Sequence, residues 1–203
     1  MISIILDTSN QYLVVALYKD GKCLESIQEL GSKRQSENAI PYLQKILAKH
    51  DIELLDVDEA IITRGPGSYT GVRVAMTIIK TLNVIRPIKV KAISSLKAYA
   101  GYDKCLSVID ARSQKVFVCA YENAKALMEE QMMDIEMFKE WRKLEKFKDF
   151  KVVGQTEIVG EAPVEVDLVD HLYQLSLNED NVENVDALVP CYLKDVEAKK
   201  ICL

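Results

Sequence analysis

The sequence predicts an α/β protein in which mixed β-sheets carry helices on their faces. Short apolar runs that end in turn residues alternate with longer stretches whose apolar residues recur at helical spacing. An apolar run that ends in an aspartate, followed by a hairpin partner, occurs once in each half of the chain. This repetition favours two related subdomains, the second of them shortened.

The first subdomain is expected to span residues 1–101, in the order β-β-β-α-β-α-β-α. Its first strand is a continuous apolar run that enters a polar turn at Asp7, which is typical of a buried central strand. Pro41 falls within the first helical pattern and either lies in the first turn or kinks the helix. We expect strands at 2–6, 12–18, 23–30, 57–63 and 90–93, and helices at 35–50, 70–82 and 95–100.

The second subdomain is expected to span residues 102–203 and to repeat the opening pattern. Its first strand ends at Asp110, and a hairpin partner follows it. The last part of the chain is predicted to form an acidic loop and an extended tail that packs against the rest of the protein. We expect strands at 105–109, 116–121, 127–133 and 151–153, helices at 135–147 and 169–177, the loop at 178–186 and the tail at 187–193.

Composition excludes several classes of protein. The 203 residues are 49% hydrophobic and 28% charged, which is ordinary for a soluble globular protein. No apolar run approaches the roughly 20 residues that span a bilayer, and the N-terminal apolar run lacks the basic region of a signal peptide. The five cysteines include no Cys-x-x-Cys pair, so we expect reduced thiols, a cytoplasmic location and no membrane partner.

Charge is distributed unevenly along the chain. Residues 1–100 carry 13 Lys and Arg against 10 Asp and Glu, a balance of +3, whereas residues 101–203 carry 13 against 21, a balance of −8. An acidic half binds nucleic acid poorly by itself. If RNA is involved, we expect a partner to make most of the phosphate contacts.

A glycine-rich turn leads from the fourth strand into the second helix. Gly65 and Gly67 permit backbone angles that cost other residues roughly 1–2 kcal/mol, and Pro66 fixes the bend between them. Either Thr70 or Ser68 can cap the helix that follows. Free N–H groups in such a turn can hold an anion, so a phosphate cradle is one interpretation.

The spacing of this turn argues against a standard phosphate loop. Thr70-Gly71-Val72 stands where a Walker A loop requires Gly-Lys-Ser/Thr, and the third glycine comes one residue late for a dinucleotide fingerprint. Taken alone, the turn is therefore interpreted as structural.

Asp7 and Asp110 end apolar strands, where the ligands of open α/β sheets gather. Such aspartates are also common turn-formers, but their matching contexts favour a duplicated phosphate-binding architecture. His50 and His171 are isolated, and the sequence has no metal-binding or nucleophile–base pattern. We therefore predict no metal and no catalytic residue. A vestigial or interfacial nucleotide site would use Asp7, Ser9, Gly65, Gly67, Ser68, Thr70, Arg73, Asp110 and Arg112.

The second helix is apolar on nearly all sides, so one sheet face cannot cover it. One stripe comprises Val72, Ala75, Met76, Ile79 and Leu82, and the other comprises Val74, Ile78 and Ile85. We expect the helix at 35–50, a partner subunit or both to cover the second stripe.

Four motifs, in order, resemble the TsaB (YeaZ) family over essentially the whole chain. They are Asp7-Thr8-Ser9, the block from Arg64 to Arg73 (RGPGSYTGVR), Ile109-Asp110-Ala111-Arg112 and Pro190-x-Tyr192-Leu193. The resemblance implies an actin/hexokinase/Hsp70-like (ASKHA) fold. It also implies the accessory subunit of the bacterial machinery that makes N6-threonylcarbamoyladenosine at position 37 of ANN-decoding tRNAs.

The resemblance further implies partners. Members of this family pair with the catalytic threonylcarbamoyl transferase, a paralogue, through helices of the first subdomain, and a small ATPase subunit joins them. The paralogue's metal-binding His-x-x-x-His pair is missing here. We expect no cofactor except ATP or ADP shared at a subunit interface, tRNA contact through the partners, and a homodimer when the chain is alone.

The resemblance and the apolar helix together predict which residues meet the partner: Ile40, Leu43, Leu47, Val72, Met76, Ile79 and Asn83. Lysine at position 76 or 79 is accordingly expected to block association and to leave the fold intact. Relatives often carry histidine where Gln35-Ser36 stands, and this departure bears on partner contacts. The alternative hypothesis is an active ASKHA-type ATPase or small-molecule kinase, and a metalloprotease has no ligand set in the sequence.

Overall fold

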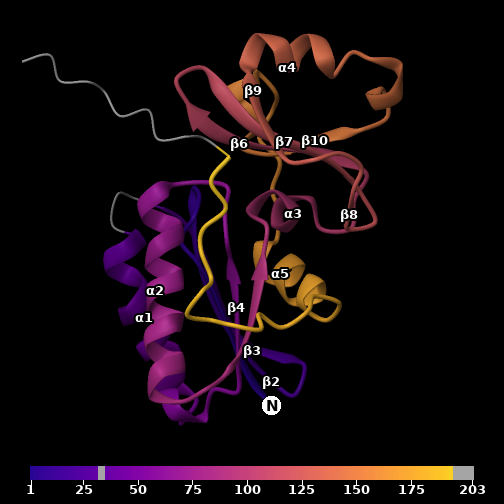
Figure 1. The fold of residues 1–203 in the computed structure, drawn as a ribbon. Coiled ribbons are helices and arrows are strands. Elements are labelled where there is room, and N and C mark those ends of the chain that lie inside the picture. Colours follow the sequence, from indigo (N-terminus) through magenta and orange to yellow (C-terminus); the bar gives the residue numbers. More distant parts are fainter. Residues whose placement is uncertain (32–34, 194–203) are drawn as a thin grey trace, which may run out of the picture.

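The computed structural model describes residues 1–31 and 35–193, which form two five-stranded sheets with helices between and outside them (Figure 1). The first sheet has the order β3-β2-β1-β4-β5. Its first three strands are antiparallel, and β4 and β5 run parallel to β1. The strands are β1 (Ile2–Asp7), β2 (Tyr12–Lys19), β3 (Lys22–Leu30), β4 (Glu59–Thr63) and β5 (Lys89–Ile93).

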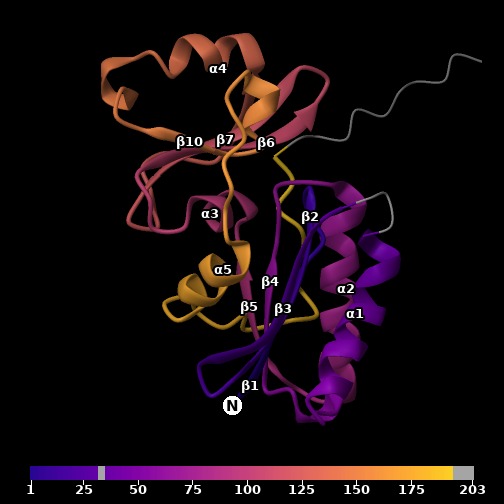
Figure 2. The same ribbon diagram turned by 180° about the vertical axis from the view of Figure 1, so that it is seen from behind.

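Helices cover both faces of the first sheet. On one face lie α1 (Gln35–Lys49), which contains Pro41, and α2 (Tyr69–Ile85), with the 3-10 turn η1 (Leu54–Asp56) between them in sequence. On the other face lie α3 (Ser95–Ala100) and α5 (Leu168–Ser176), as the reverse view shows (Figure 2). Among the described residues, no helix combines the length and apolar character that crossing a bilayer requires.

The second sheet has the order β10-β6-β7-β8, and β9 also pairs with β7. A shared core lies between the two sheets and includes α3 and α5, whereas α4 packs with the 3-10 turns on the outer face (Figure 1). The elements are β6 (Cys105–Arg112), β7 (Lys115–Glu122), β8 (Lys125–Ala126), β9 (Gln131–Asp134), α4 (Ile135–Trp141), η2 (Glu145–Phe147), β10 (Lys151–Gly154) and η3 (Thr156–Val159).

The two sheets repeat one topology. In each, an antiparallel hairpin is followed by a further antiparallel strand, a helix and a strand parallel to the first. The turn is repeated too, because the Asp7 carboxylate accepts a bond from Ser9 N and the Asp110 carboxylate accepts one from Arg112 N, both at 2.7 Å. The predicted relation between the two halves, with a shortened second copy, is thus confirmed; only a 3-10 turn follows β10 where α2 follows β4.

After β10 the chain returns to the first sheet. Val182 N donates to the β5 carbonyl of Val90 at 2.8 Å, and Cys191 N donates to Arg64 O at 2.7 Å. The predicted loop is thus tied to the edge strand β5, and the predicted tail is tied to the glycine-rich turn. The division at residues 101 and 102 remains a prediction, and residues 194–203, with Cys202, lie outside the described part of the chain.

Two predicted elements were wrong in extent. The helix expected at 135–147 ends at Trp141, because the chain turns there to pack Phe147 against the Trp141 ring at a tilt of 46°, with centroids 4.1 Å apart. The strand expected at 127–133 is confined to β9, since β8 ends before it at Ala126. The loop between β8 and β9 carries Glu130 to the Tyr121 hydroxyl. In both cases tertiary contacts override the local pattern.

Candidate functional site

The glycine-rich turn packs directly on the turn that ends β1. A Cβ at position 67 would lie 2.4 Å from Ser9 O, and one at position 71 would lie 1.9 Å from Thr8 O. Hydrogen bonds join the two turns, from Ser68 N to Ser9 O (2.7 Å) and from Thr8 Oγ1 to Gly71 O (2.6 Å). These glycines are needed because two backbones meet, as the structural interpretation of the turn requires.

Ser68, rather than Thr70, caps α2, since Ser68 Oγ accepts a bond from Gly71 N at 3.2 Å. Gly65 has a φ of +94°, within the left-handed region that favours glycine, and its α-carbon faces the carbonyl of Cys191. The turn therefore joins three segments: the end of β1, the start of α2 and the C-terminal tail.

Asp7 lies behind this turn and is buried. Its Oδ1 accepts hydrogen bonds from Ser9 N (2.7 Å) and from Thr63 Oγ1 (2.5 Å), and Thr63 Oγ1 also lies 3.0 Å from Ser9 Oγ. Burial raises the pKa of the Asp7 carboxyl, and the hydrogen bonds from Ser9 and Thr63 oppose that change. A hydroxyl cluster thus separates this aspartate from the cleft.

The raised pKa predicts how stability depends on pH. Above the ordinary value of 3.8, the unfolded chain loses the Asp7 proton before the folded chain does, so Asp7 lowers stability as the pH rises. The free energy of unfolding of Asp7→Asn, minus that of wild type, is therefore expected to increase from about pH 3 to about pH 7. Denaturant unfolding of both proteins over this range measures the difference, and a difference that does not change with pH would contradict it.

A polar cleft of about 360 Å³ lies between the two repeated turns. On the second-sheet side, the Arg112 guanidinium lies 2.9 Å from the Asp110 carboxylate, and Asp110 N donates to Gln155 Oε1 at 2.6 Å. Six predicted nucleotide-site residues line the cleft, and Asp7, Gly65 and Arg73 do not. The six are Ser9, Gly67, Ser68, Thr70, Asp110 and Arg112.

Arg73 instead contacts aromatic side chains. Its guanidinium carbon lies 3.8 Å from the centroid of the Tyr69 ring, and its Nε donates to Tyr192 Oη at 2.7 Å. The two tyrosine rings stack with centroids 5.5 Å apart. Sequence reasoning did not place these tyrosines in a site, although both belong to the motifs it singled out.

The described residues contain no group of three or more His, Cys, Asp or Glu side chains placed to hold a metal ion. The carboxylate in the cleft lining is that of Asp110, which already pairs with Arg112. Hydroxyl and backbone groups line the cleft beside it. Such a lining can bind an anion or a polar ligand.

A second concave surface, the α1–α2 groove, lies on the opposite side of the first sheet from the shared core. It has a volume of about 750 Å³, and its lining is mostly apolar. Ile85 is 63% exposed in it, and Ile40 is also exposed. The second apolar stripe of α2 thus lies beside α1 and reaches solvent at Ile78 and Ile85, so α1 covers it only in part. Its cover by a partner subunit stays a prediction. The apolar lining residues are Ile40, Leu43, Leu47, Ala48, Ile52, Leu54, Ile78, Leu82 and Ile85.

The predicted interface residues divide into two groups of three and a single residue, Asn83. Ile40, Leu43 and Leu47 line the groove, the two leucines being buried in its floor. Val72, Met76 and Ile79 are buried in the chain's own core, because their stripe of α2 faces the first sheet. Asn83 Oδ1 accepts a bond from Ile88 N and so closes the turn after the helix. The burial of Met76 and Ile79 therefore argues against the expectation that lysine at either position leaves the fold intact.

Comparison with known proteins identifies the family. A family model described as "TsaD: tRNA N6-adenosine threonylcarbamoyltransferase" matches residues 27–168. The tRNA threonylcarbamoyladenosine biosynthesis protein TsaB of Bacillus subtilis is 29% identical, over 96% of this chain and 94% of its own. TsaB of Haemophilus influenzae is 32% identical over 68% of this chain, and the match covers 59% of that relative.

Solved structures show the same fold. A Pseudomonas aeruginosa protein described as similar to peptidase YeaZ superposes with a TM-score of 0.74 at 24% identity, over 95% of this chain and 99% of that one. YeaZ from Pseudomonas aeruginosa superposes with a TM-score of 0.71 at 22% identity, over the same shares of the two chains. Together with the duplicated sheets, these matches confirm the predicted α/β fold of two related halves. The chain belongs to the family of the threonylcarbamoyltransferase TsaD and, within it, to the TsaB (YeaZ) branch.

Proposed function

We propose that the chain is a non-catalytic subunit in the synthesis of N6-threonylcarbamoyladenosine on ANN-decoding tRNAs, and that it docks the catalytic transferase through the α1–α2 groove. The name of the curated relatives supports the pathway. The match to the transferase model supports a paralogous partner, because paralogues can pair through equivalent surfaces.

The groove is the observation that carries the docking proposal. A concave apolar surface of about 750 Å³ between two helices is typical of a site that receives helices of another subunit. Ile85 and Ile78 supply a stripe on α2, and Ile40 supplies the facing edge on α1. The same surface allows a homodimer when the transferase is absent, because two copies of one apolar patch can cover each other.

The non-catalytic role is supported by the state of the two strand-end aspartates. Asp7 is buried behind Ser9 and Thr63, and Asp110 is already paired with Arg112. Under this proposal a small ATPase subunit completes the complex, any ATP or ADP lies where subunits meet, and the complex works in the cytoplasm. The acidic second half leaves most phosphate contacts with tRNA to the partners.

The alternative, an active ATPase or kinase, is favoured by one observation, the polar cleft between the two repeated turns. It requires nucleotide turnover by the isolated chain that Asp7→Asn removes. Calorimetry and a phosphate-release assay on the purified chain with ATP and Mg²⁺ separate the two proposals. We expect no turnover by the chain alone.

Reconstitution tests the proposed function. The catalytic transferase, the small ATPase and an ANN-decoding tRNA are supplied with threonylcarbamoyl-adenylate, with and without this chain. We expect modified adenosine, measured by mass spectrometry of the nucleosides, only when the chain is present. Equal yields without the chain would overturn the proposal.

A further inference from the structure

At the N-terminal end of α2, the two tyrosines and Arg73 form a half-exposed aromatic surface. Tyr69 is 50% and Tyr192 45% exposed, although each ring contacts the other and the Arg73 guanidinium. Large aromatic side chains usually bury more of their surface. Rings held in this way have area left for another planar group to stack on.

Three exposed arginines belong to this region. Arg73 is exposed, and its contacts in the described part of the chain are with tyrosines and not with a carboxylate. Arg64 is exposed and has no ion pair with any described residue, and its carbonyl accepts the N–H of Cys191, the residue before Tyr192. Arg112 is 85% exposed at its side chain and shares the cleft with Tyr69.

Stacking rings and exposed guanidinium groups suit a ligand with planar bases and a phosphate backbone. Proteins that bind single-stranded nucleic acid combine these two features, because every base has a face that can stack and every linkage has a charge. A tyrosine and arginine cluster that only anchored the tail would need neither Arg64 nor the exposed half of each ring.

We infer that Tyr69, Tyr192, Arg64, Arg73 and Arg112 form a surface that binds single-stranded RNA, such as a loop of the tRNA. The inference deepens the proposed function, because it gives this chain a direct contact with the RNA in addition to those of its partners. It stands apart from the α1–α2 groove, whose lining begins beyond the first turns of α2, at Thr77.

Fluorescence anisotropy with a labelled seven-nucleotide single-stranded RNA, at several salt concentrations, tests the inference on the full chain. We expect Tyr69→Ala to weaken binding about fivefold or more, since one stacking contact is lost. Arg64→Gln should weaken binding and reduce the salt slope by about 1, because one phosphate contact is lost. Among the described residues, the tail bonds to the Arg64 carbonyl and not to its guanidinium, so this variant keeps the tail in place.

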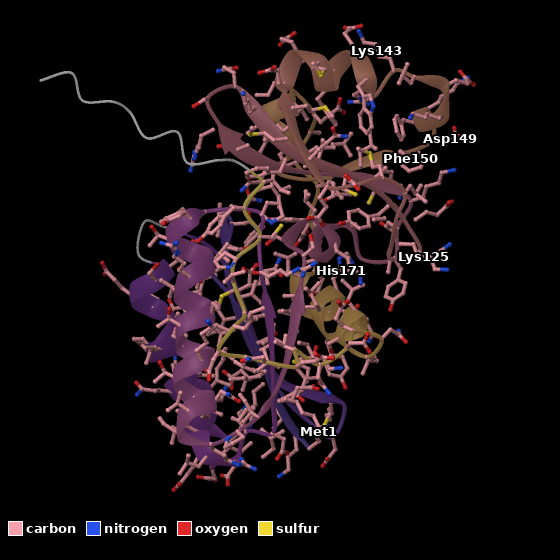
Figure 3. The ribbon with its side chains drawn as sticks, in the orientation of Figure 1. Met1, Lys125, Lys143, Asp149, Phe150 and His171 are labelled. Carbon is pink, nitrogen blue, oxygen red and sulfur yellow. The ribbon has the colours of Figure 1, made fainter. Side chains whose placement is uncertain are left out.

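Matched controls make the result specific. Tyr102 is a similarly exposed tyrosine near α5, and Lys143 is an exposed cation on the far side of the second sheet from α2 (Figure 3). Tyr102→Ala and Lys143→Gln are expected to bind RNA as wild type does. If Tyr69→Ala and Arg64→Gln also bind as wild type does, or if ATP at millimolar concentration displaces the RNA, the inference is wrong.

The RNA-binding test and the test of the proposed function can fail independently of each other. Tyr69→Ala and Arg64→Gln leave the groove unchanged, so each should still associate with the catalytic transferase. RNA binding by the chain without transferase association would contradict the docking proposal alone, and association without any effect of these variants on RNA would contradict this inference alone.

Discussion

Replacing Ile85 with glutamate is expected to weaken association with the catalytic transferase at least about 30-fold, the effect of losing a central interface contact. Ile85 is 63% exposed and lines the α1–α2 groove, so the folded chain tolerates the charge, whereas a docked partner would have to bury it. Isothermal titration calorimetry of the purified chain with the transferase measures the change.

Val84→Glu is the matched control. Val84 is the preceding residue of α2, is 76% exposed and does not line the groove. It should bind as wild type does and show the same far-ultraviolet circular dichroism. Equal weakening by both variants would mean that the end of α2, and not the groove, meets the partner.

Replacing Ile79 with lysine is expected to unfold the chain. Ile79 is fully buried between α2 and the first sheet, and an unpaired charge there costs several kcal/mol, comparable with the whole stability of many domains. Even Ile79→Ala should lower the free energy of unfolding by about 2–5 kcal/mol, because it leaves a cavity. Urea unfolding followed by circular dichroism measures both effects.

Val84→Lys introduces the same charge on the exposed side of the same helix and should unfold near the wild-type urea midpoint. If the Ile79→Lys protein folds and only fails to bind the transferase, residue 79 belongs to the interface and not to the core. The two variants therefore separate loss of fold from loss of association.

The sequence was sufficient to predict the helix α2 and its two apolar stripes, because helical spacing alone defines them. It could not tell which stripe faces the sheet. Ile79 and Ile85 both look apolar along the chain, yet one is buried and the other lies in the groove, a difference set by where β1 and β4 pack.

Similar reasoning applies to the cleft. The matching contexts of Asp7 and Asp110 predicted the repeated turns, since the pattern of strand, acid and polar turn is local. The burial of Asp7 depends on contacts with distant residues such as Thr63, and the cleft itself depends on the relative placement of the two sheets. The stacking of Tyr69 on Tyr192 joins residues more than half the chain apart, which no local pattern reveals.

The most direct test of the account is the yield of N6-threonylcarbamoyladenosine in the reconstituted system with the two α2 variants. If the chain acts by docking the transferase through the α1–α2 groove, Val84→Glu should support the wild-type yield and Ile85→Glu should support almost none. A full yield with Ile85→Glu would contradict the account, because modification would then proceed without the groove.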